Sequence, residues 1–225
     1  MKHKLKSAVV LLSGGQDSTT CLYIAKQTFE EVIAIGFDYG QKHKIELKQA
    51  KKISKDAEVP FEIINIKGLL SNSALTEHDK DVNEKHPSNE HLPASWTPAR
   101  NAIFLNIAMT YAYNKGINDV VTGTCQSDFS GYPDCRRVFL DSMQLSMSLA
   151  LAIDTRIHSP LMYLTKAHTW KIAKDLNILD IIINDTITDY NGSKKKNDWG
   201  MGADDNPASK LRKEGYEKAK EKNWI

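Results

Sequence analysis

Cysteine is scarce in this sequence of 225 residues. The three cysteines are Cys21, Cys125 and Cys135, and no two of them stand in a Cys-x-x-Cys pattern. An odd number of cysteines without close pairs supports neither a disulfide framework nor a zinc site built from cysteines. The pattern fits a reducing compartment, and we expect a cytoplasmic protein.

Long apolar runs are also missing. Apolar stretches such as residues 103–108 and 178–183 are far shorter than the about 20 apolar residues that a membrane-spanning helix needs. The run behind the basic N-terminus, residues 8–12, ends in Ser-Gly-Gly. It indicates a first β-strand and not a signal peptide. We therefore expect no membrane partner.

The sequence also lacks a large excess of charge of either sign. The formal net charge is +2, which is too small for a general nucleic-acid-binding protein, so we expect no direct contact with nucleic acid. Positive charge gathers near the C-terminus, at residues 194–196 and 210–222. This pattern is typical of a solvated helix face, and a docking surface for a phosphate-bearing partner is the alternative.

What is present is an alternation of short apolar runs and amphipathic segments, which predicts an α/β fold. We expect strands at 7–12, 32–37, 61–66, 119–123 and 155–158, and helices at 17–27, 42–56, 100–113, 136–151 and 165–176. The β-α-β-α-β order predicts a Rossmann-like parallel sheet with helices on both faces. Residues 68–97 are predicted to be a long loop, either a functional lid or disordered.

A turn rich in glycine and hydroxyl side chains follows the first strand. Its sequence is Ser13-Gly14-Gly15-Gln16-Asp17-Ser18, directly before a predicted helix. Glycines let the backbone approach an anion, and a helix N-terminus adds partial positive charge. Ser13, Ser18 and Thr19 can donate to phosphate oxygens. Asp17 would repel phosphate alone, so we expect it to hold Mg²⁺ or to cap the helix; a plain Gly-Gly turn is the structural alternative.

This turn resembles the PP-loop signature Ser-Gly-Gly-x-Asp-Ser, whose enzymes cleave ATP between the α and β phosphates and transfer AMP. The resemblance implies the adenine nucleotide alpha hydrolase type of Rossmann-like sheet. It also implies a PP-loop nucleotide-binding catalytic domain at residues 1–185. The predicted ATP-binding residues are Leu12, Ser13, Gly14, Gly15, Gln16, Asp17, Ser18, Thr19, Asp38 and Tyr39.

Further segments narrow the resemblance. They are Asp38-Tyr39-Gly40-Gln41 with His43 and Glu46, Pro98-Ala99-Arg100-Asn101, the run from Asp128-Phe129-Ser130-Gly131 to Tyr132-Pro133-Asp134-Cys135-Arg136, Pro160-Leu161 and Thr165-Lys166. In this order and spacing the chain resembles the 7-cyano-7-deazaguanine synthases from about residue 7 to about residue 190. That family converts 7-carboxy-7-deazaguanine, ammonia and ATP into the nitrile, through an adenylated acid and an amide.

The resemblance implies a role for each matching residue. Asp17, Arg100 and Lys166 are predicted to be catalytic, with Asp17 also holding Mg²⁺. Arg100 and Lys166 are expected to neutralise phosphates or the substrate carboxylate. The predicted substrate-binding residues are Asn101, Asp128, Gly131, Tyr132, Asp134 and Arg136. Structural alternatives stay open: a tight turn for the residues from 128 to 136, a hydrogen bond at the helix start for Asn101, and buried packing for Cys135.

The chain departs from the family at four positions. The family carries four cysteines near its C-terminus that bind a structural Zn²⁺, whereas this chain has Asp189, Ala203, Asn206 and Ser209 there. Structural zinc requires thiolate or imidazole ligands, so we predict no zinc. Residues 186–225 are expected to form a small helical or irregular extension. Packing of Trp199, Tyr216 and Trp224 on the body, or a partner subunit, would have to order it.

Three functions compete. The first is the nitrile-forming synthase, with small-molecule partners only and a homodimer as the expected assembly. The second is a zinc-less relative that stops at the amide or passes the activated base to another acceptor. The third is a non-catalytic nucleotide-binding module, against which the intact Asp17, Arg100, Asp134 and Lys166 argue.

Overall fold

The computed structural model describes residues 4–42, 45–71, 73–77, 81, 84–86, 89–126, 132–189 and 192–225. The elements in chain order are β1 (Leu5–Leu11), α1 (Gln16–Thr28), β2 (Phe29–Asp38), α2 (Ile45–Asp56), β3 (Phe61–Asn65), β4 (Lys85–His86), β5 (Asn89–Pro93), α3 (Arg100–Asn114), β6 (Asp119–Val121), the 3₁₀ helix η1 (Pro133–Cys135), α4 (Arg137–Leu151), β7 (Arg156–His158), α5 (Lys166–Asp175), α6 (Leu179–Asp185), β8 (Lys196–Asn197), β9 (Gly200–Met201) and α7 (Pro207–Glu221).

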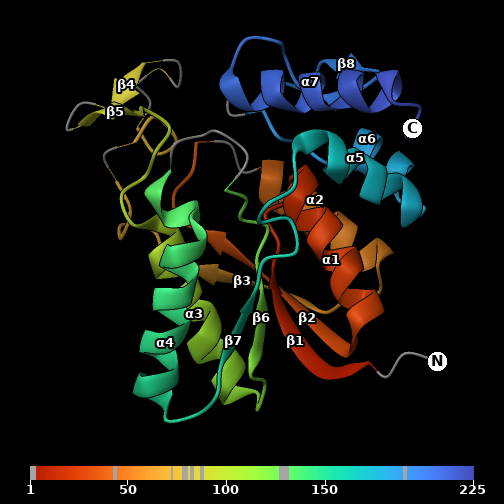
Figure 1. Cartoon of the computed structure of the whole chain (residues 1–225). Coiled ribbons are helices and arrows are strands. Elements are labelled where there is room, and N and C mark those ends of the chain that lie inside the picture. Colours follow the sequence, from red (N-terminus) through yellow and green to blue (C-terminus); the bar gives the residue numbers. More distant parts are fainter. Residues whose placement is uncertain are drawn as a thin grey trace.

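The centre of the molecule is a five-stranded sheet in the order β3-β2-β1-β6-β7 (Figure 1). All four pairings are parallel, with Val10 of β1 opposite Ala34 of β2 and Val121 of β6. The chain moves outward from β1 to β3 and then returns to add β6 and β7 on the other side. The order therefore reverses at β1, and in parallel sheets ligands bind outside the carboxyl ends of the strands at such a point.

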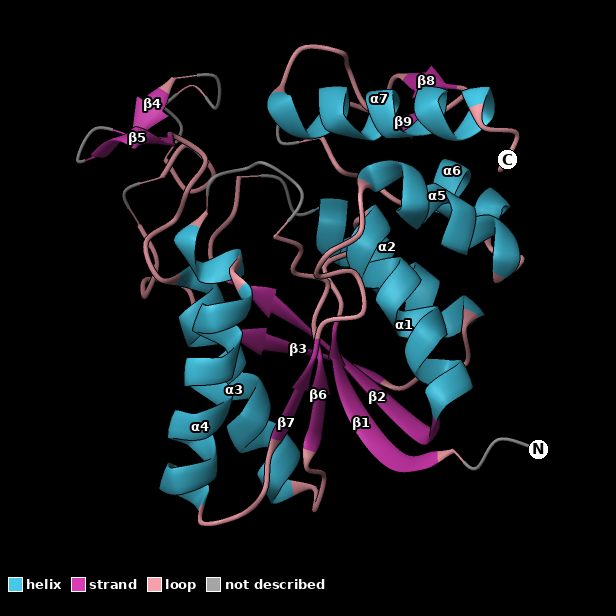
Figure 2. Ribbon diagram, in the orientation of Figure 1, coloured by secondary structure: helices cyan, strands magenta, loops and turns pink. Residues whose placement is uncertain are grey.

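Helices cover both faces of this sheet, as Figure 2 shows. Alternate residues of β1 point to opposite faces. Val9 packs in one apolar cluster with Leu105 of α3 and Leu140 of α4. Ala8 and Val10 pack in another cluster, with residues of α1 and α2 such as Leu22 and Ile53. The predicted Rossmann-like arrangement is confirmed.

The five predicted strands and five predicted helices all form, with ends that differ from the predicted ones by up to three residues. The prediction of a single loop over residues 68–97 is wrong for its second half, because β4 and β5 pair there as an antiparallel hairpin. The hairpin is short and irregular, so alternation of apolar residues does not reveal it. It is anchored by buried His86, whose ring meets the ring of Trp96 edge-on at 5.0 Å.

The C-terminal extension lies over α5 and α6, on the side of the molecule where the strands of the sheet end (Figure 1). Its aromatic residues pack as expected: Trp199 joins the apolar cluster of Trp170, and Tyr216 meets the Trp170 ring at 5.1 Å. Trp224 lies 5.0 Å from the ring of His168. In the described part of the chain, every helix is too short or too polar to span a bilayer.

Candidate active site

A cavity of about 790 Å³ lies at the carboxyl ends of the central strands. Its walls come from residues 11–13 and 15–18 at the end of β1 and the start of α1, residues 39, 41, 42, 46 and 47 after β2, and residues 122–125 after β6, together with Lys166 of α5. The extension closes it with residues 187–189, 207, 208 and 211. A volume of several hundred Å³ is the size of a cofactor or nucleotide site.

The loop between β1 and α1 is shaped by its glycines. Gly14 has a φ of +88°, and a Cβ added there would lie 2.4 Å from the carbonyl oxygen of Glu46. Gly15 is the N-cap of α1 without a side-chain capping bond, and a Cβ there would meet nothing closer than 3.5 Å. Gly14 is therefore required by the tight contact with α2, and Gly15 leaves the helix N-terminus open towards the cavity.

Hydroxyl groups hold the loop closed upon itself. The Oγ atoms of Ser13 and Ser18 lie 3.0 Å apart, and the backbone amide of Ser13 donates to Ser18 Oγ at 3.2 Å. Ser18 Oγ can also donate to the Gly15 carbonyl at 3.2 Å. The loop is thus preorganised around the start of α1, where an anion is favoured.

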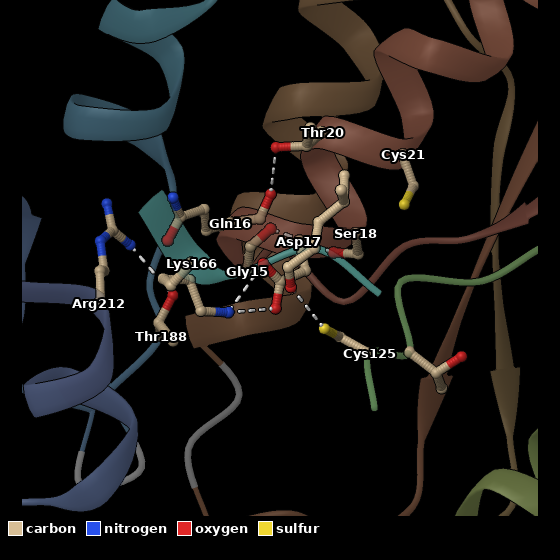
Figure 3. Close-up of polar contacts among 12 residues, drawn as sticks. Gly15, Gln16, Asp17, Ser18, Thr20, Cys21, Cys125, Lys166, Thr188 and Arg212 are labelled. Carbon is tan, nitrogen blue, oxygen red and sulfur yellow. Dashed lines mark hydrogen bonds and ion pairs between the residues drawn. The ribbon is translucent and has the colours of Figure 1, made fainter. Parts of the chain in front are cut away.

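Asp17 and Lys166 form the ion pair at the centre of the site. Lys166 Nζ lies 2.7 Å and 3.0 Å from the two carboxylate oxygens of Asp17 (Figure 3). The Lys166 side chain is only 6% exposed, and Gly215 of α7 packs against it so closely that a Cβ there would come within 2.7 Å of its Cβ and Cγ. The structure thus brings together two residues that are 149 positions apart, as the sequence predicted for a shared site.

A second group of polar side chains lies across the loop from this pair. The guanidinium carbon of Arg100 lies 6.0 Å from the ring centroid of Tyr39. Glu46 faces the same cavity, and burial raises its pKa to about 7, an effect that nearby Arg100 partly offsets. Burial also raises the pKa of Tyr39, while Arg100 lowers it. A carboxyl group with a pKa near neutral is suited to proton transfer.

Glu46 was given no role by the sequence, although it stands in one of the motifs that carry the resemblance. Its signal was its place in the first turn of α2, directly after the polar segment that follows β2. Sequence alone could not show that the backbone at Glu46 contacts Gly14, which places its side chain beside the phosphate loop.

The cavity is also lined by Tyr132, Ser95 and Asn101. The hydroxyl groups of Tyr132 and Ser95 lie 2.7 Å apart. The backbone amide of Asn101 donates to Asp134 Oδ2 at 3.0 Å, and its side chain donates to Cys135 Sγ at 3.3 Å. The Asp134 carboxylate therefore positions the start of α3. Burial raises the pKa of Cys135 to about 12, so its thiol stays protonated.

The other predicted site residues divide into three groups. Leu12, Gln16 and Tyr39 line the cavity, and both side-chain polar atoms of Gln16 are buried without a partner among the described residues. The residues that line the cavity do not include Thr19, Asp38, Asp134 or Arg136. Thr19 is buried in α1, and Asp38 pairs with Lys67 at 3.0 Å. Arg136 is the exposed N-cap of α4. Asp128 and Gly131 lie outside the described residues.

Metal ligands are sparse in the described ranges, which contain no group of three or more His, Cys, Asp or Glu side chains arranged to hold an ion. Mg²⁺ at nucleotide sites needs less than this, because it is commonly bound through one or two carboxylates together with phosphate oxygens. Asp17 is the cavity carboxylate nearest the helix N-terminus, so it fits that mode.

Comparison with known proteins identifies a family. A family model described as queuosine biosynthesis protein QueC matches residues 7–220. The chain is 47% identical over 213 residues, 94% of both chains, to a 7-cyano-7-deazaguanine synthase of Clostridium botulinum (strain Loch Maree / Type A3). It is 46% identical over 219 residues, 96% of both chains, to that of Clostridium novyi (strain NT). To that of Staphylococcus aureus (strain bovine RF122 / ET3-1) it is 43% identical, over 93% of this chain and 92% of that protein.

Solved structures support the fold alone. The crystal structure of a 4-thiouridine synthetase–RNA complex with bound ATP matches with a TM-score of 0.52 and 17% identity. The match covers 94% of this chain and 53% of that one. The fold is therefore shared with a protein of very different sequence.

Proposed function

Since the chain belongs to the family of queuosine biosynthesis protein QueC, we propose that it converts 7-carboxy-7-deazaguanine, ammonia and ATP into 7-cyano-7-deazaguanine, through an adenylated acid and an amide. The observation that carries this proposal is the single cavity that joins the phosphate loop and the Lys166–Asp17 pair to the polar wall at Tyr132. One cavity of this size accommodates nucleotide and acid together.

The phosphate loop supports binding of the ATP diphosphate. Open backbone amides at the N-terminus of α1 and the hydroxyl groups of Ser13 and Ser18 present donors to phosphate oxygens. Lys166 and Arg100 add positive charge on two sides. Bound this way, the diphosphate is stabilised as it leaves, which favours attack at the α phosphorus.

The two activations follow the same sequence of steps. A carboxylate oxygen of the substrate attacks the α phosphorus, and diphosphate leaves. Ammonia then attacks the carboxyl carbon, the bond to AMP breaks, and the nitrogen loses a proton. The amide oxygen attacks the α phosphorus of a second ATP, and a second diphosphate leaves. Loss of AMP and of two further protons from nitrogen then leaves the nitrile. The protein has to position these groups and to accept protons.

We assign proton acceptance to Glu46. Its side chain faces the cavity beside Arg100, and its pKa of about 7 matches neutral conditions. Arg100 stays charged and, with the Tyr39 ring below it, is placed to hold the carboxylate or the α phosphate. Asp17 orients Lys166 and is the residue that would hold Mg²⁺, which supplies charge neutralisation at the phosphates when it is bound.

The cavity wall formed by Tyr132, Ser95 and Asn101 supports recognition of a flat heterocycle. Tyr132 offers an aromatic ring and a hydroxyl group that is already paired with Ser95, and Asn101 contributes an amide. Asp128 and Gly131 stay proposals for substrate contacts. For Asp134 and Arg136 we propose positioning of α3 and α4.

The deciding experiment incubates purified enzyme with 7-carboxy-7-deazaguanine, ATP and ammonium, and identifies the products by mass spectrometry. The proposal expects nitrile together with AMP and diphosphate. Amide or a conjugate as the end product would favour the second hypothesis from the sequence, and no nucleotide turnover would favour the third. An Asp17→Ala variant is the control and should release neither AMP nor diphosphate.

The assembly and the division of the chain also stay proposals. We propose a homodimer, in which the exposed side chains of Val138, Leu145 and Leu149 on α4 would be candidates for the contact. The boundary between 1–185 and 186–225 marks the point where the chain leaves α6. Molar mass by light scattering tests the assembly, and limited proteolysis tests the boundary.

A further inference from the structure

The four positions at which the family carries zinc cysteines form a buried hydrogen-bonded cluster, made up of Asp189, Ala203, Asn206 and Ser209. One carboxylate oxygen of Asp189 accepts from the Ala203 amide at 2.7 Å and from the Ser209 hydroxyl at 2.8 Å. The other accepts from the Ser193 amide at 3.2 Å. Asp189, Asn206 and Ser209 are each at most 2% exposed. A single carboxylate thus joins three separate points of the extension.

Asn206 completes the cluster as the N-cap of α7. Its side-chain oxygen accepts from the Ser209 amide at 3.1 Å, and its side-chain nitrogen lies 3.2 Å from Ser209 Oγ. Such a cap satisfies a helix-end donor that would otherwise be unpaired. The start of α7 is therefore fixed to Asp189 through Ser209, and Ser209 bonds to both Asn206 and Asp189.

Zinc does not fit these residues. A tetrahedral structural site uses thiolate or imidazole ligands, and the cluster supplies one carboxylate, one amide, one hydroxyl and a methyl group. The carboxylate oxygens and the Asn206 oxygen already accept hydrogen bonds from the chain itself. The chain therefore lacks the ligands for the zinc ion that the family binds, and hydrogen bonds among these residues join the extension to the body instead.

The cluster reaches the active site through α7. Arg212, which is fully buried, donates to Thr188 Oγ1 at 3.1 Å (Figure 3). It also donates to Thr186 Oγ1 at 2.9 Å. The backbone amide of the intervening Ile187 donates to the carbonyl of Gly14 at 3.1 Å. Segment 186–189 is thus held between α7 and the phosphate loop.

The same helix also positions the catalytic lysine. Gly215, one turn beyond Arg212, packs directly on Lys166, whose Nζ bonds to Asp17. Displacement of α7 would therefore release Thr188 and Lys166. These two residues line the cavity beside the phosphate loop, where the diphosphate is proposed to bind, and this part is called the diphosphate end.

We propose that Asp189 is a positioning residue that fastens α7 without a metal ion and thereby holds Thr188 and Lys166 at the diphosphate end of the cavity. Its effect on nucleotide binding rests on the proposed function. Its effect on the extension does not depend on any activity.

The test compares Asp189→Asn with Asp198→Asn, the same change at an exposed carboxylate of the extension. In Asp189→Asn the new side-chain NH2 group can face N–H and O–H donors that now bond to the carboxylate, and those donors then lose their acceptor. We therefore expect a Tm lower by roughly 4–8 °C. We also expect faster proteolysis within residues 192–225, and a Kd for ATP about tenfold higher, measured by calorimetry without the acid. The kcat at saturating ATP should change much less than the Kd, and Asp198→Asn should match the unmodified chain.

The metal is tested on the same proteins. The unmodified chain should contain no stoichiometric zinc after purification from zinc-supplemented medium, and a chelator should leave its Tm unchanged. A quadruple variant, D189C/A203C/N206C/S209C, should bind one zinc per chain and become chelator-sensitive.

Three results would overturn the proposal: stoichiometric zinc in the unmodified chain, a chelator-sensitive Tm there, or an Asp189→Asn variant whose Tm and proteolysis match those of Asp198→Asn. If the quadruple variant fails to fold, the comparison of the two asparagine variants still decides. A chain that binds ATP as expected but makes no nitrile would contradict the proposed function and leave this proposal standing.

Discussion

The body of the molecule and its C-terminal extension are held together by different forces. In the body, two apolar layers sandwich the sheet, with residues such as Val9 and Leu22 fully buried. The extension packs Trp199 and Tyr216 against Trp170 of α5, but its connection to the active site runs through two buried charged side chains, Asp189 and Arg212. Both regions wall the same cavity.

The difference matters because the two forces fail in different ways. Apolar cores tolerate substitutions that conserve volume. A buried polar network tolerates little, since removing one partner leaves the others without hydrogen bonds. We therefore expect the stability of the extension to depend on single residues, and the stability of the body to depend on the total apolar area that it buries.

The largest expected effect is that of Arg212→Met. Arg212 donates to the carbonyl oxygens of Ile182 and Trp199 as well as to Thr188, and methionine keeps much of its volume without any donor. Burial lowers the pKa of Arg212 to about 10, so the side chain is still charged at neutral pH. Each buried acceptor that loses its donor costs about 1–3 kcal/mol of unfolding free energy, and urea denaturation would measure the total.

The control for Arg212→Met is Leu22→Ala in the body, which should cost about 2–5 kcal/mol through lost burial and a cavity. Hydrogen exchange separates the two: Arg212→Met should first unprotect residues 192–225, whereas Leu22→Ala should unprotect the sheet. Equal unprotection of both regions by Arg212→Met would mean that the extension is not a distinct unit.

The body has a partly buried acid of its own, Glu46, and the next prediction uses its pKa of about 7. If Glu46 accepts protons, kcat should rise about tenfold per pH unit below pH 7 and level off above it. Glu46→Gln should lower kcat about 10²-fold at pH 8 and abolish this rise. A matching change at exposed Glu31 should leave the profile unchanged. A pH profile that persists in Glu46→Gln would assign the proton acceptor to another group.

Stability should move in the opposite direction to activity at the same residue. The folded-state pKa of Glu46 is raised above the ordinary value of 4.5, so its contribution to stability is fully present below pH 4.5 and is lost as pH rises through about 7. Glu46→Gln should therefore flatten the fall in Tm between these pH values.

A third prediction concerns the glycines of the phosphate loop. At Gly14, alanine would meet the Glu46 carbonyl at 2.4 Å with φ at +88°, and left-handed strain alone costs about 1–3 kcal/mol. At Gly15 the nearest atoms are 3.5 Å away, so Gly15→Ala should fold normally. Calorimetric Tm values check this pair; equal values would mean that the loop can move away from α2.

The two regions also differ in how far the sequence could predict them. Continuous apolar residues in β1 and spaced apolar residues in α2 predicted the sheet and its helices, because burial follows periodicity. The loop, Lys166 and Arg100 were found through motifs. The hairpin at β4–β5 was missed because it is too short and irregular to show a periodic pattern. Glu46 and the Asp189 cluster were missed because their contacts join residues far apart in the chain. Asp189, Asn206 and Ser209 have the composition of a polar loop, and only the fold shows that they are buried.

The smallest expected effect is that of Lys52→Ala, on the body close to the point where the extension begins. Lys52 Nζ lies 2.8 Å from both Asp56 and Asp185, which joins α2 to the end of α6, but its side chain is 49% exposed. Exposed ion pairs contribute only about 0.2–1 kcal/mol, and salt weakens them further because solvent ions screen exposed charges. Lys52→Ala should therefore lower stability slightly in dilute buffer and not measurably in 1 M salt. The loss in Asp189→Asn should persist in salt, because hydrogen bonds buried from solvent are screened little. If both losses vanished together, the Asp189 cluster would behave as a surface ion pair, and the contrast between the extension and the body would fail.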